Sequence, residues 1–77
     1  MTNKNEIANV IRNRIKGHED APKAQKLLQV ANIIENATEE EWNGSFNDVK
    51  NVNDLVSTMR IRTGKLADKI QREVFGM

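Results

Sequence analysis

The spacing of the apolar residues restricts this chain to helices. Along most of its length they recur at intervals of three and four, the repeat that places side chains on one face of an α-helix. Ile7, Val10, Ile11 and Ile15 are the first such set. No run alternates apolar and polar residues as a half-buried strand does. We therefore predict an all-α fold.

Capping residues divide this pattern into separate helices. Residues 4 to 16 form the first predicted helix, with Asn3 opening a capping box and Gly17 following its end. The second begins at about residue 21, because Pro22 suits the first turn of a helix, where a missing N–H costs nothing. Its apolar face is broad enough to touch more than one neighbour, so we expect it to be the central helix. The core of that face is Ala24, Leu27, Leu28, Ala31 and Ile34.

The second half of the chain continues the helical pattern. Thr38 and Glu41 form a second capping box, and Gly44 predicts the end of a short helical turn. A further helix is expected from about 47 to 59. The final helix is indicated by Leu66, Ala67, Ile70 and Val74. The prediction is a single domain over residues 1–77, a compact bundle of four main helices plus one short helical turn.

Composition narrows the class of protein further. A chain of 77 residues with 38% hydrophobic and 30% charged residues is expected to fold, but its core is small, so a homodimer or a partner would help it. It has no cysteine, which excludes disulfides and thiolate metal sites and favours the cytoplasm. No apolar run is long enough for a membrane span or a signal peptide, so no membrane association is expected.

The charges are grouped along the chain as basic, acidic and basic. Residues 4 to 16 and 60 to 72 are rich in lysine and arginine, whereas residues 35 to 54 are acidic. Two arrangements would explain this grouping. Either the two ends fold together into one basic face, or the acidic middle neutralises them within the bundle.

The stretch from Leu55 to Ile70 resembles the helix-turn-helix pattern of bacterial regulators. Leu55, Val56 and Met59 would belong to its first helix, Ile61 would fill the corner of the turn, and Leu66, Ala67 and Ile70 would belong to the second helix. Two helices that cross steeply must bury their facing residues while the turn residue closes the corner. The C-terminal half is therefore predicted to be helix-turn-helix-like, with Ile61 buried.

This resemblance implies a small regulator that binds duplex DNA, with bases or phosphates contacted from the turn and the second helix. The residues expected at that surface are Arg60, Arg62, Thr63, Lys65, Lys69 and Arg72. Three positions depart from the pattern. Arg60 stands where glycine is common, Gly64 would lie inside the first turn of the second helix, and Asp68 would place a carboxylate against phosphate.

A second interpretation needs no nucleic acid. The same apolar spacing packs any helical hairpin into a bundle, with its arginines and lysines solvated. The protein would then be a non-enzymatic adaptor or inhibitor, of the kind common among bacterial and phage accessory factors. It would bind a protein partner through the basic C-terminal helix, or through the acidic segment 35–54. In that segment Trp42 is either an interface anchor steered by Glu39, Glu40 and Glu41, or part of the core.

Chemistry-bearing motifs are scarce. His18 has Glu19 and Asp20 beside it, but a metal needs several converging ligands, so a solvated loop is expected there. The sequence contains no phosphate-binding glycine loop, no nucleophile motif and no paired histidines. We expect no enzymatic activity, no cofactor and no metal site.

Overall fold

The computed structural model describes residues 3–77, and within them the chain forms five α-helices and no strand. The prediction of an all-α fold is therefore confirmed. The helices are α1 Lys4–Ile15, α2 Pro22–Asn36, α3 Glu39–Phe46, α4 Val52–Thr58 and α5 Lys65–Phe75. None of the helices in this range is both long and apolar enough to pass through a bilayer.

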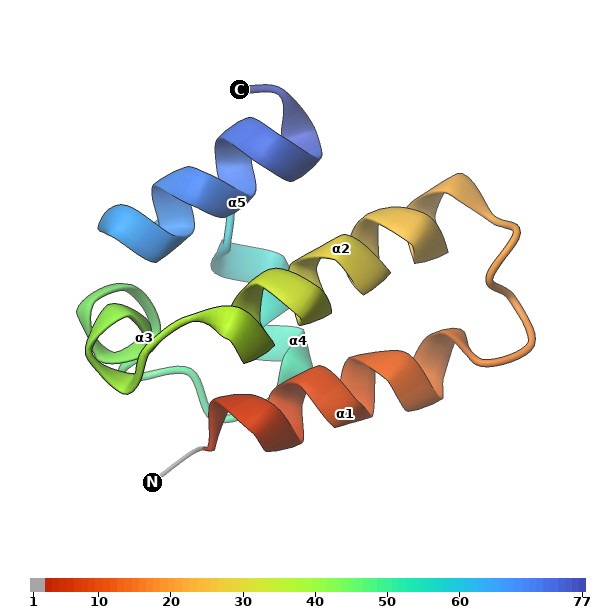
Figure 1. Ribbon diagram of the computed structural model, residues 1–77, viewed down its shortest axis with the longest axis horizontal. Helices are drawn as coiled ribbons and strands as arrows, with labels where there is room; N and C mark the ends of the chain where they lie inside the picture. Colours follow the sequence, from red (N-terminus) through yellow and green to blue (C-terminus); the bar gives the residue numbers. More distant parts are fainter. Residues whose placement is uncertain (1–2) are drawn as a thin grey trace.

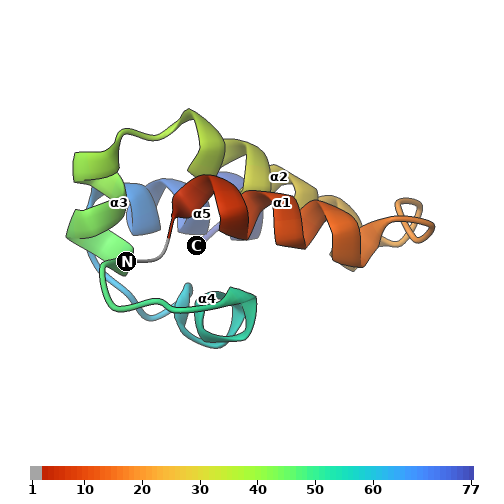
Figure 2. The ribbon, with the colours of Figure 1, turned by 90° about the horizontal axis from the view of Figure 1, so that it is seen from below.

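Three of the helices lie side by side. Helices α1 and α2 form an antiparallel pair, and α5 lies along the other side of α2, which is therefore central as its broad apolar face predicts (Figure 1). Helix α4 lies on one face of these three helices, and α3 closes the end at which α1 begins and α2 ends (Figure 2). Helix α5 packs more extensively against α3 and α2 than against α4, its neighbour in sequence.

All five helices contribute to one hydrophobic core. Ile11 of α1, Ile34 of α2 and Leu55 of α4 are almost completely buried in it. Trp42 and Phe46 of α3 join them with ring centroids 5.1 Å apart, a tilted aromatic contact of the favourable kind. Two of the three aromatic side chains thus fill the interior.

The boundaries of α3 and α4 differ from the sequence prediction. Helix α3 passes through Gly44 and ends at Phe46, because Phe46 belongs to the core and anchors one further turn. Helix α4 begins at Val52 rather than near 47, because the Asn51 side chain accepts a hydrogen bond from the Asp54 N–H and caps it there. The Thr38–Glu41 capping box is present as predicted.

The first helix also begins as predicted but is capped differently. Asn3 is the N-cap residue, and its side chain accepts from the N–H of Asn5 instead of completing a capping box with Glu6. Lys4 is buried, and its Nζ donates to the backbone carbonyl of Glu35, 3.0 Å away at the end of α2. A lysine is favourable there because the last carbonyls of a helix lack intrahelical partners.

Ion pairs connect the acidic middle of the chain to its basic ends. Arg12 pairs with Glu35 at 2.7 Å, Arg62 pairs with Asp48, and Lys65 lies 4.0 Å from Glu41. For Arg12, Arg62 and Lys65, these contacts follow the arrangement in which the acidic middle pairs with the ends.

Candidate functional site

Arg62, one of the residues expected at a DNA surface, is turned toward the protein. Its Nε donates to Thr58 Oγ1 at 2.7 Å, its Nη1 reaches the carbonyl of Ser45 at 3.4 Å, and its guanidinium pairs with Asp48. The guanidinium also lies over the ring of Phe46. With 18% of its side chain exposed, Arg62 connects the turn before α5 to α3 and presents little of its charge to solvent.

The turn itself corrects the expectation that Ile61 is buried. Ile61, predicted to fill the corner, is 78% exposed. The corner is instead held by polar groups, because the Gln71 side chain donates to the carbonyls of Met59 and Arg62 at 3.0 and 2.9 Å. These two bonds join the end of α4 and the turn to α5 without an apolar plug.

Gly64 is the N-cap residue of α5 and not part of its first turn. Its φ of 106° is a conformation that other residues rarely adopt. It also lies so close to Ser45 that a Cβ atom would overlap the hydroxyl. That hydroxyl accepts from the N–H of Ala67 at 3.2 Å, so Ser45 of α3 caps α5 from outside the helix.

The remaining residues predicted to contact DNA are exposed. Thr63 precedes α5, and Lys65, Lys69 and Arg72 lie on its solvent side. Arg72 is partly neutralised, because its Nε lies 2.9 Å from Asp68 one helical turn away. The structure therefore brings Lys65, Lys69 and Arg72 onto one helix, with Asp68 among them and Arg62 turned away.

The acidic helix α3 uses part of its predicted partner-binding set for its own structure. Trp42 is 2% exposed, so it belongs to the core and cannot anchor a partner from the surface. Glu41 completes the capping box. Its carboxylate accepts a hydrogen bond from the Thr38 N–H, and this bond is the main reason why the pKa of the carboxyl lies below its usual range. Glu39 and Glu40 remain exposed.

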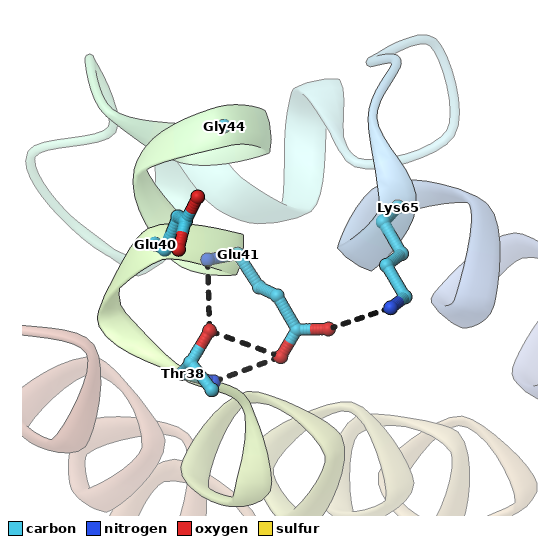
Figure 3. Close-up of a pocket in the computed structure, with 5 residues that line it drawn as sticks. All are labelled: Thr38, Glu40, Glu41, Gly44 and Lys65. Atoms are coloured by element: carbon cyan, nitrogen blue, oxygen red, sulfur yellow. Dashed lines mark hydrogen bonds and ion pairs between the residues drawn. The ribbon is translucent and has the colours of Figure 1, made fainter.

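A broad, open depression lies beside Glu41. It has a volume of about 460 Å³ and is lined by Thr38, Glu40, Glu41, Gly44 and Lys65. Figure 3 shows the Glu41 carboxylate between Thr38 and Lys65, so its hydrogen-bonding capacity is directed to its own neighbours. Glu41 therefore offers a ligand in this depression little unpaired charge.

A second cavity, which we call the Phe75 groove, was not foreseen from the sequence. It has a volume of about 210 Å³ and lies where the first half of α2, the end of α4 and the end of α5 meet. Its apolar lining consists of Pro22, Leu27, Val56, Met59 and Phe75. Its charged lining is entirely positive and consists of Lys23, Lys26 and Arg60.

Phe75 organises two of these cations. Lys26 Nζ lies 5.8 Å and Arg60 Cζ 4.8 Å from the centroid of its ring, within the range of a cation–π interaction. Of the residues expected at a DNA surface, Arg60 is the one that enters this groove. The sequence signal for this groove was the pair Lys23 and Lys26, which lie one helical turn apart and near Pro22. Nothing in the sequence connects this pair to Phe75.

Residues 3–77 contain no cluster of three or more histidine or carboxylate side chains that could hold a metal ion. No protein-family model, curated protein or solved structure significantly matches this chain. The arguments for a function therefore depend on the geometry described above.

Proposed function

We propose that this protein is a non-enzymatic adaptor or inhibitor that binds a protein partner through the Phe75 groove at the end of the basic C-terminal helix. The observation that carries the proposal is that apolar surface stays open there, between three cations and without a carboxylate in the lining. Elsewhere, the two aromatic residues of α3 are buried and Arg62 is engaged internally.

The groove has the usual composition of a protein contact point. Interfaces are centred on apolar and aromatic side chains, with arginine enriched and polar groups at the rim. Here Met59 and Phe75 contribute apolar surface, and Arg60 lies at the edge. Ile61, which follows Arg60 in the chain and is 78% exposed, adds apolar surface next to it in sequence.

Site-specific photocrosslinking tests this proposal. A photoreactive phenylalanine analogue is placed at Ile61, the residue that follows Arg60 of the groove, and at Asn13, an exposed position of α1 outside it. In cells that express the protein naturally, we expect a discrete protein adduct from position 61 and none from position 13. The adduct should weaken when Lys26→Glu is added. Equal labelling at both positions, or no adduct at position 61, would overturn the proposal.

The second candidate is binding of duplex DNA through α5, as the resemblance to helix-turn-helix regulators implies. The specific observation in its favour is that Thr63, Lys65, Lys69 and Arg72 are all exposed. This function would need two copies of the chain, since small helix-turn-helix proteins read paired half-sites as dimers. The inward direction of Arg62 and the Asp68–Arg72 pair reduce the positive charge available for it.

Fluorescence anisotropy with a labelled duplex at low salt tests the DNA candidate. Binding that weakens steeply as salt rises, and that is lost in a Lys65→Ala/Lys69→Ala variant, would support it. Light scattering should then show a dimer. Unchanged anisotropy at low salt would rule the candidate out.

A further inference from the structure

We propose that the Phe75 groove binds an acidic segment of the partner protein, which inserts one large apolar side chain between Lys23, Lys26 and Arg60. This inference depends on the proposed protein-binding function and adds the chemistry of the partner. It is argued from the charge, the size and the preorganisation of the groove.

The charge of the lining determines the sign of the occupant. Lys23 and Lys26 approach from α2 and Arg60 from the end of α4, so the three cations come from two separate elements around one cavity. Glu73, two residues before Phe75, does not belong to the lining. Glu19 and Asp20 lie in the loop before α2 and do not belong to it either. There the Glu19 side chain accepts from the N–H of Gly17 at 3.0 Å and so is directed back into its own loop. Carboxylates of a partner would supply the opposite charge that the lining lacks.

The size of the cavity sets how much of the partner enters it. Pockets that hold a whole small-molecule ligand usually measure about 300 to 1,000 Å³. At about 210 Å³ the groove is smaller than these and suits a single side chain. Because its floor includes Leu27, Val56 and Met59, that side chain should be aliphatic or aromatic.

Phe75 prepares the groove for such an occupant. Its ring is already contacted by Lys26 and Arg60, which holds both cations close to the apolar floor before a partner arrives. Side chains ordered in advance lose less entropy on binding. The same contacts occupy the ring on which a nucleic-acid base would have to stack, and phosphates would leave the apolar floor uncovered. These features favour an acidic protein segment over nucleic acid.

Three synthetic peptides test the inference by NMR titration of the full-length protein. The first is a short glutamate-rich peptide with one phenylalanine, the second replaces that phenylalanine with alanine, and the third replaces the glutamates with glutamine. The first should shift the methyl resonances of Val56 and Met59. We expect each replacement to weaken binding about tenfold or more, because it removes either the buried ring or the charge complementarity.

Variants of the protein provide the matched control. Lys26→Glu should abolish binding of the glutamate-rich peptide, whereas Lys50→Glu, an exposed residue outside the groove, should change it little beyond the common effect of net charge. Both substitutions are on the surface, and circular dichroism checks that both variants fold. Equal loss in the two variants would mean that the peptide responds to overall charge, and would overturn the inference.

Other outcomes also have defined meanings. Equal binding of the glutamine peptide, shifts confined to residues outside the groove, or stronger shifts of Val56 and Met59 by a DNA duplex would each overturn the acidic-segment inference. If no peptide binds but crosslinking at Ile61 still captures a protein in a Lys26-dependent manner, the proposed function stands and the partner chemistry is wrong. If both experiments fail, the proposed function fails with it.

Discussion

The two helix pairs at the ends of the chain are positioned by different forces. Helices α1 and α2 lie along one another, and their apolar stripes meet through residues such as Ile11 and Ile34. Apart from the buried Lys4, which donates to the Glu35 carbonyl, their polar links are nearer the surface, where an ion pair such as Arg12–Glu35 contributes little. The periodicity of the sequence is therefore sufficient to explain how this pair packs.

The pair formed by α4 and α5 shares the apolar core but is also positioned by polar contacts, some of them to α3. Ser45 of α3 caps α5, Arg62 connects the turn to α3, and Gln71 binds the end of α4 and the turn. Helix α5 is held against α3 and α2 as a result. An apolar pattern that resembles a helix-turn-helix thus does not by itself determine the direction of the second helix.

The largest effect is expected in the N-terminal pair, from Ile11→Ala. Ile11 is 1% exposed, and removing most of a buried isoleucine side chain costs about 2–5 kcal/mol of unfolding free energy. That is a large part of the about 4–12 kcal/mol expected for a domain of this size. Urea unfolding followed by Trp42 fluorescence measures the loss. The adjacent Val10→Ala, at a position 42% exposed, should cost less than half as much, and similar losses would contradict the packing described for α1 and α2.

In the C-terminal pair, Gly64→Ala should cost about 3 kcal/mol. The new residue would be strained at φ 106°, and its Cβ would displace the Ser45 hydroxyl that caps α5. Gly44→Ala is the matched control, because a Cβ there meets nothing within 4 Å and alanine favours a helix interior by about 0.5–1 kcal/mol. The two changes should move the urea midpoint in opposite directions. A neutral Gly64→Ala would show that Ser45 does not hold α5.

Arg62→Ala should destabilise the protein by about 2 kcal/mol, since it removes hydrogen bonds from a charged group to Thr58 and Ser45 and the packing on Phe46. Arg62→Lys should recover little, because one ammonium cannot reproduce the several directions of a guanidinium. Arg60→Ala tests the nearby arginine, whose guanidinium lies over the ring of Phe75, and should cost under about 1 kcal/mol. If the two alanine variants are equally stable, Arg62 is not a structural residue.

The neighbouring residues 60 to 64 show how far sequence reasoning reaches. The turn was predictable, because the helical periodicity breaks there, and so were the Thr38–Glu41 capping box and α2 as the central helix. The exposure of Ile61 and the inward direction of Arg62 were not. The direction of Arg62 depends on Ser45 and Asp48, which lie more than a dozen residues away and approach the turn only after α3 has packed. Local periodicity carries no information about such contacts.

The candidate site was predictable to a smaller extent for the same reason. Arg60 could be named as a surface cation, but its groove combines α2, α4 and α5, and Phe75 had no local pattern to mark it. Trp42 could be assigned to the core as one of two alternatives, and its burial agrees with that one. Residues whose role is set within one helix could be predicted from the sequence. The groove that combines three helices could not.

The smallest expected effects concern the pH dependence of stability. One ion pair from each region is compared. Hydrogen bonding from Arg62 lowers the pKa of Asp48 below its ordinary 3.8, and hydrogen bonding from Arg12 lowers the pKa of Glu35 below its ordinary 4.5. Each carboxylate thus stabilises the fold when the pH is above the ordinary pKa of the group. This stabilisation is lost as the pH falls through the lowered pKa.

Asp48→Asn and Glu35→Gln each remove one of these carboxylates. Each variant should therefore lose less unfolding free energy than the unchanged protein when the pH is lowered from neutral to about pH 3. Because the two pairs lie in different regions, the double variant should show the sum of the two reductions. Urea midpoints measured across this range would reveal both effects. An unchanged pH profile in Asp48→Asn would mean that Arg62 holds the turn through Thr58 and Ser45 without help from this carboxylate. Position 48 would then matter less to the placement of α5 than Ser45 does.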